Sequence, residues 1–102
     1  MNNKQPYKVE VHEDAAKMVY DHIRFISNIR IPAARRLHIQ LSAAIDSLKE
    51  NPERCARYEL KKAKAQYHRL ITGRYSIIFS IDKQASTVFI RYILDTRQNI
   101  DS

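Results

Sequence analysis

The chain has 102 residues, of which 44% are hydrophobic and 28% charged, with a formal net charge of +7. This composition is typical of a folded domain and excludes a chain disordered by excess charge. One cysteine, Cys55, excludes an internal disulfide, and one glycine, Gly73, excludes a glycine-rich phosphate-binding loop. No apolar run approaches the roughly 20 residues of a membrane span, and no signal-peptide stretch begins the chain. We expect a cytoplasmic protein with no membrane partner, no metal and no other cofactor.

The first half of the chain predicts one strand and two helices. Residues 7–12 (YKVEVH) alternate apolar and polar side chains, which is the period of a half-buried strand. Acidic residues at 13–14 suit a helix start, and the apolar positions that follow recur every three or four residues as far as about Asn28. Pro32 suits the first turn of a second helix, which Asn51-Pro52 ends. The two apolar stripes are Ala15, Val19, Ile23 and Ile26, and then Leu37, Leu41, Ala44, Ile45 and Leu48.

The second half predicts a loop and three strands. Residues 53–66 show no clean period and are interpreted as a long basic connection, with room for a short turn of helix. Residues 67–72, 75–81 and 87–95 are strand-like, and Gly73 suits a tight hairpin that needs a positive φ. The order is therefore β-α-α-β-β-β, a fold of the α+β class with a helical hairpin packed on a small, mainly antiparallel sheet. We expect a single domain over residues 1–102, with tails at 1–6 and 97–102.

The positive charge is concentrated in the second half of the chain. From Glu53 onward there are ten basic and five acidic residues, so this half carries +5 of the +7. Such an excess predicts attraction to nucleic acid or to an acidic protein. Arg35 and Arg36 are expected on the exposed face of the second helix, and Tyr67, Tyr75 and Phe79 in the core. The candidate binding residues are Lys61, Lys62, Lys64, Arg69, Arg74, Arg91 and Arg97.

Three segments of the second half resemble a known family. They read YHRLI at 67–71, GRYSIIFSID at 73–82 and ILDTRQ at 93–98. Together with the proline-broken helical hairpin they are similar to the RelE/ParE superfamily of bacterial toxins from type II toxin–antitoxin systems. The resemblance covers nearly the whole chain.

The resemblance implies one of two activities. One branch of the superfamily contains ribosome-dependent mRNA endonucleases, and the ParE-like branch poisons DNA gyrase without known nuclease chemistry. It also implies a cognate antitoxin as partner, and contact with operator DNA only through the antitoxin complex. The target is then DNA gyrase or, for the other branch, the ribosome and its mRNA.

The residues expected of a nuclease are largely replaced in this chain. RelE-like cleavage uses two lysines and an arginine on neighbouring strands, where this chain has His68, Leu70 and Ser76. Asp95 stands where many relatives have histidine, while Arg97 matches the family position. His68 and Arg97 are therefore the candidate catalytic residues. We favour the ParE-like branch; the alternatives are an mRNA endonuclease and a degenerate toxin that retains only antitoxin binding.

Overall fold

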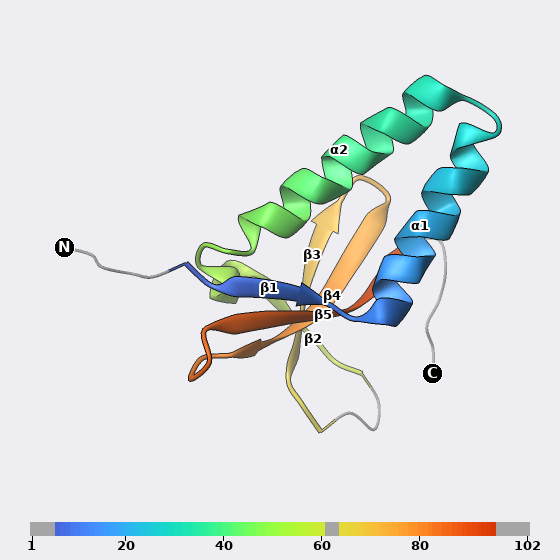
Figure 1. Ribbon diagram of the computed structural model, residues 1–102. Coiled ribbons are helices and arrows are strands. Elements are labelled where there is room, and N and C mark those ends of the chain that lie inside the picture. The colour runs from blue at the N-terminus through green and yellow to red at the C-terminus, as the bar shows by residue number, and fades with distance from the viewer. Residues whose placement is uncertain (1–5, 61–63, 96–102) are drawn as a thin grey trace.

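Two helices cover one face of a five-stranded sheet (Figure 1). The computed structural model describes residues 6–60 and 64–95. The sheet has the order β1-β5-β4-β3-β2, in which β1 is parallel to β5 and the other pairs are antiparallel. The predicted α+β class is confirmed. The elements are β1 (Lys8–Val11), α1 (Glu13–Ser27), α2 (Ile31–Ser47), the short 3-10 helix η1 (Pro52–Arg54), β2 (Ala56–Tyr58), β3 (Tyr67–Thr72), β4 (Tyr75–Asp82) and β5 (Thr87–Asp95).

The two helices begin in different ways. The backbone N–H of Asp14 donates to the Nδ1 atom of His12 at 3.0 Å, so His12 caps α1, and acidic residues fill its first turn. Helix α2 starts at Ile31-Pro32 with Arg30 at the cap position, no side-chain cap and no acidic residue in its first turn. Packing rather than capping therefore holds the start of α2 in place.

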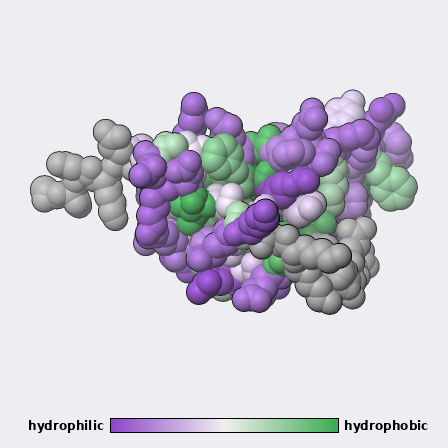
Figure 2. All heavy atoms as spheres, turned by 90° about the horizontal axis from the view of Figure 1, so that it is seen from below, coloured by the Kyte–Doolittle hydropathy of each residue, from purple (hydrophilic) through white to green (hydrophobic). Residues whose placement is uncertain are grey.

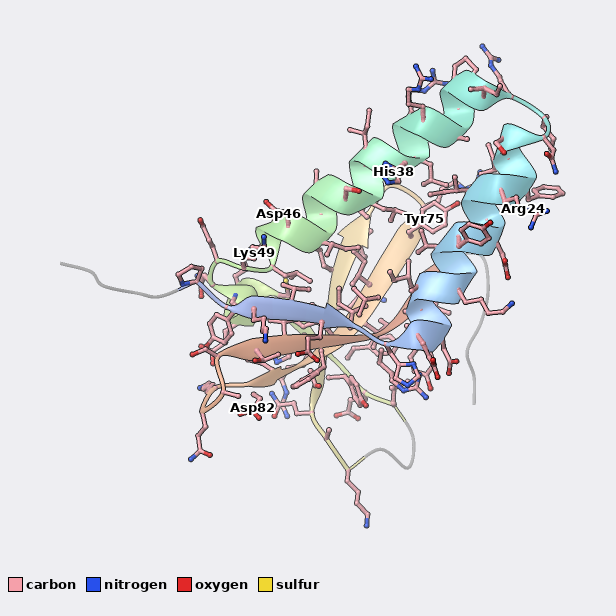
Figure 3. The ribbon with its side chains drawn as sticks, in the orientation of Figure 1. Arg24, His38, Asp46, Lys49, Tyr75 and Asp82 are labelled. Carbon is pink, nitrogen blue, oxygen red and sulfur yellow. The ribbon has the colours of Figure 1, made fainter. Side chains whose placement is uncertain are left out.

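The core lies between the helical hairpin and the sheet, because both predicted stripes face the same side. All nine stripe residues either belong to the core cluster or pack against it. Their partners on β4 and β5 are Tyr75, Ile77, Phe79, Val88, Ile90 and Ile93. Tyr75 lies under the helices (Figure 3), where its hydroxyl is 3.1 Å from the Nδ1 atom of His22. No helix of the described residues is long and apolar enough to cross a membrane.

A β-bulge adjusts β5 to this core. Ile78 pairs with Tyr92, but Phe79 pairs with Ile90, so Arg91 is an extra residue on β5. Ile90 and Ile93 are consequently both buried in the core although they are three positions apart in a strand. The bulge thus keeps the apolar face of β5 continuous.

The connection over residues 53–66 differs from the prediction. The short turn of helix is present as η1, but the connection also contains the strand β2, which pairs with β3 through Ala56 opposite Arg69 and Tyr58 opposite Tyr67. A three-residue strand is too short to show an alternating pattern, which is why the sequence did not reveal it. The predicted hairpin loop is confirmed, since Gly73 has a φ of 58° between β3 and β4.

We predict that Leu41→Asp prevents folding, whereas Ser42→Asp leaves the protein folded. Leu41 is 3% exposed in the centre of the core, and its neighbour Ser42 is exposed. An unpaired carboxylate in an apolar site costs several kcal/mol, comparable with the total stability of about 5–15 kcal/mol of a domain. Circular dichroism melting of both variants is the measurement, and a cooperative transition for Leu41→Asp at the wild-type temperature would contradict the prediction.

Candidate functional site

The sheet has a second face that the helices do not cover, here called the open face. Side chains alternate along each strand, so the residues of β3 and β4 between those of the core face point to this side. Seen from below, on the side away from the helices, the surface is mostly hydrophilic with small separate hydrophobic patches (Figure 2). The open face carries Tyr58, Tyr67, Arg69, Ile71, Ser76, Ile78, Ser80, Phe89 and Tyr92.

A hollow of about 210 Å³ lies on the open face. The strand register places Phe89 beside Ser80, and Tyr67 lines the same hollow, so it combines a small hydroxyl with two aromatic rings. Charged groups from β1 and from the bulge complete the rim. The full lining is Glu10, Val11, His12, Tyr67, Ser80, Phe89, Ile90 and Arg91. This arrangement can hold a small polar or aromatic group against cationic and acid–base side chains.

Two of the candidate binding residues, Arg69 and Arg91, lie on this face. The guanidinium of Arg91 is 3.4 Å from the Nδ1 atom of His12 and 3.5 Å from the carboxylate of Asp14, and it lies 4.6 Å from the centre of the Tyr92 ring. The guanidinium of Arg69 lies 5.5 Å from the centre of the Tyr58 ring. Cation–π contacts of this kind hold the guanidinium groups in position, so the open face has two fixed positive charges.

The other candidate binding residues lie elsewhere. Arg74 is in the β3–β4 turn, where its guanidinium is 3.2 Å from the buried carboxylate of Asp95. Lys64 is exposed on the β2–β3 loop and lines a hollow of about 340 Å³ there. Lys61, Lys62 and Arg97 lie outside the described residues, as do most of the predicted tails.

His68 is on the core face of β3, opposite in direction to its neighbour Arg69. Its ring stacks on Phe79 with a centroid distance of 5.6 Å, and its Nδ1 atom is 3.0 Å from the carbonyl oxygen of Cys55. Only 8% of His68 is exposed. Its surroundings give it a packing role, and no polar group of the open face reaches it.

The register of β3 against β4 shows which β3 residues share the open face with Ser76, and they differ from those expected from the sequence. Ser76 pairs with Ile71, so Tyr67, Arg69 and Ile71 lie beside it on the open face, whereas Leu70 packs against the core. Tyr67 was expected in the core and instead lines the hollow. Arg69 therefore places a cation on the open face of β3. It lies between His68 and Leu70, the two positions at which the family's lysines were expected.

His12 and Glu10 are site residues that the sequence did not single out. Their only signal was their position at the end of β1, beside a strand whose bulge the sequence does not reveal. Within residues 6–60 and 64–95 no three His, Cys, Asp or Glu side chains come together as a metal site. Burial raises the pKa of the Cys55 thiol, which opposes its ionisation, and an ion pair with Glu53 raises the pKa of Lys83.

Comparison with known proteins identifies the class of this fold. The family model described as the ParE toxin of the type II toxin–antitoxin system parDE matches residues 9–100. The structure is similar to the toxin–antitoxin complex RelBE2 from Mycobacterium tuberculosis, with a TM-score of 0.62, 21% identity, and coverage of 93% of this chain and 97% of that chain. No match was found among curated proteins.

A second solved structure has the same fold. The archaeal RelE–RelB complex from Pyrococcus horikoshii OT3 matches with a TM-score of 0.53 and 18% identity, covering 92% of this chain and 99% of that chain. The fold is that of toxins of the RelE/ParE superfamily. Because the family model covers nearly the whole sequence, the chain belongs to the ParE toxin family of type II toxin–antitoxin systems.

We predict that His68→Ala lowers the free energy of unfolding by about 2–4 kcal/mol, through a cavity beside Phe79 and an unsatisfied Cys55 carbonyl. His68→Phe keeps the stacked ring and loses only the hydrogen bond, so its loss should be smaller. Urea unfolding of the three proteins is the measurement. Equal stability of wild type and His68→Ala would show that the ring contributes no packing.

Proposed function

We propose that this toxin arrests growth by binding DNA gyrase and that a cognate antitoxin neutralises it. The observation that carries the proposal is the match of residues 9–100 to the ParE toxin family, since the ParE-like branch that the sequence resembles poisons gyrase. Gyrase acts on the chromosome, so the proposed place of action is the cytoplasm.

The chemistry of the open face supports binding rather than RNA cleavage. Cleavage needs preorganised donors around the scissile phosphate and a group that moves a proton. At the centre of this face stand Ser76, with a short hydroxyl, and Ile78, which is fully buried. His68 faces the core, where its Nδ1 atom is engaged with Cys55. The described residues at the centre of the face therefore offer no group that is suited to proton transfer.

One observation favours the second candidate, a ribosome-dependent mRNA endonuclease. Arg91, His12 and Tyr67 meet around the hollow, and these side-chain types can stabilise a phosphate, move a proton and stack on a base. The Nδ1 atom of His12 accepts the N–H of Asp14 at 3.0 Å, so only its Nε2 atom is left for proton exchange. A role in cleavage would therefore fall to that nitrogen.

Expression without antitoxin separates the two functions. We predict gyrase-dependent DNA breaks with intact transcripts, and stalled cleavage complexes when the purified toxin is added to gyrase and plasmid DNA. The same cells are assayed for transcripts cut at ribosomal A sites. Cut transcripts that disappear in His12→Ala or Arg97→Ala would establish the endonuclease instead. Absence of both effects and of growth arrest would indicate a degenerate toxin.

The antitoxin is proposed to bind at the open face and the adjacent sheet edge. The two solved structures described above are complexes of toxin and antitoxin, according to their descriptions. Among the described residues β2 is an edge strand with one partner, β3, so its other edge is available to an incoming segment. Arg69 lies beside this edge and suits an acidic partner. Contact with operator DNA would follow only through the antitoxin.

We predict that antitoxin affinity falls as salt concentration rises and that Arg69→Glu weakens it by about tenfold or more. Arg57→Glu is the matched control, because Arg57 is exposed on the neighbouring strand but points to the other side of the sheet. Titration calorimetry with the protein encoded beside the toxin gene is the measurement. Equal losses for both variants would show that only overall charge matters.

A further inference from the structure

The arginines of this protein fall into two groups according to their contacts. Arg54 binds three backbone carbonyls, Arg69 and Arg91 lie over aromatic rings, and Arg74 pairs with Asp95. The side chains of five others make no hydrogen bond, ion pair or ring contact with any described residue; one of them, Arg57, is on β2, and the remaining four are on the helical hairpin. They are Arg24, Arg30, Arg35 and Arg36.

The sequence around these four arginines has no compensating charge. Residues 22–45 contain four arginines, no lysine and no acidic residue. Elsewhere in the described residues most lysines have a carboxylate partner, such as Lys17 with Asp21 and Lys49 with Asp46. The end of the hairpin is thus a region of uncompensated positive charge.

Large apolar side chains are exposed beside the same arginines. Phe25 is 64% exposed, Ile29 70% and Ile31 61%. They flank the turn between α1 and α2, outside the apolar stripes that form the core. We call this region the hairpin tip, defined as Arg24, Phe25, Ile29, Arg30, Ile31, Arg35 and Arg36.

Arg24 lies in the last turn of α1, where a cation is favourable, but the stability of the fold does not explain the positive charge at the start of α2. A helix N-terminus is electropositive, so cations near it are unfavourable. Helix α2 nevertheless has Arg30 at its cap position, no side-chain cap and no acidic residue in its first turn. Helix α1 of the same hairpin has the favourable arrangement, with Glu13 and Asp14 in its first turn.

The shape of the hairpin tip suits insertion into a partner. In Figure 1 the α1–α2 turn lies far from the start of β1 and projects beyond the β3–β4 turn, and in Figure 3 Arg24 points away from the core. A shallow, open hollow of about 280 Å³ lies at its base, between Ile26 and Ala33 of the hairpin and Gly73 and Arg74 of the turn. A projection with a hollow at its base can interlock with a concave surface.

We propose that the hairpin tip is the surface with which this toxin binds its protein target, and that the complementary surface is a concave, acidic patch with apolar side chains. The inference rests on the proposed function, because it assigns a contact surface to the target. Arginine and aromatic residues are enriched in protein interfaces and lysine is depleted, which is the composition of the tip. Contact with phosphates alone would leave its three exposed apolar side chains unused.

The test uses two double variants of the full chain, Phe25→Ser/Ile29→Ser and Arg30→Glu/Arg35→Glu. The matched controls are Ile39→Ser, which is 60% exposed further along α2, and Arg57→Glu on β2. Gyrase affinity is measured with purified protein, and antitoxin affinity, thermal melting and growth arrest are measured for every variant. We expect each tip variant to lose about tenfold or more in gyrase affinity, to lose growth arrest, to keep its antitoxin affinity, and to melt at or above the wild-type temperature.

The other outcomes separate this inference from the proposed function. Wild-type toxin without effect on gyrase contradicts the proposed function alone, and growth arrest then decides: its loss in the tip variants supports the inference, and its retention overturns it. Full gyrase affinity of both tip variants overturns the inference, as does a loss confined to antitoxin affinity. Binding to duplex DNA or anionic vesicles that only the tip variants lose, or a dimer that they dissociate, also overturns it.

Discussion

Burial of the helical hairpin on one face of the sheet is the constraint on which the rest of this structure depends. The stripes of α1 and α2 are covered by apolar side chains of one face of the sheet, among them Tyr75, Ile77 and Phe79. The bulge at Arg91 satisfies the same constraint on β5, since it brings Ile90 and Ile93 to the same face. The positions of Arg91, Arg69 and His68 all follow from that choice of face.

Most helices and strands could be predicted from the sequence because each extends over several repeats of its apolar period. The stripes of the two helices and the strands at 67–72 and 87–95 agree with the structure, and Gly73 has the positive φ that its hairpin loop requires. The fold class followed from their order. By contrast β2 has only three residues, and a pattern of period two needs more than that to be distinguished from a loop.

The candidate site was harder to predict, because a site depends on register. In a strand a displacement of one residue moves every side chain to the other face. Motif matching aligned His68 and Leu70 with the family's lysines, but the two-residue loop pairs Thr72 with Tyr75 and so directs Arg69 to the face of Ser76. The contribution of Arg91 depends on a bulge, which local sequence does not encode. The contacts of Arg91 with His12 and Asp14 join residues that are 79 and 77 positions apart in the chain, so no local sequence pattern could predict them.

In the helical hairpin, local sequence preferences favour the start of α1, whereas tertiary packing is needed for the start of α2. Where α1 starts, capping by His12 and the two acids favour the helix locally, and packing of Ala15 adds to it. Where α2 starts, Pro32 favours the helix locally, but there is no side-chain cap and Arg30 lies unfavourably at the helix N-terminus, so burial of Ala34, Leu37 and Leu41 further along contributes most of the stability. Departures from local rules that coincide at one place are typical of functional surfaces. The core can carry this cost because the tip lies at the end of the hairpin, where a helix terminus contributes least to burial.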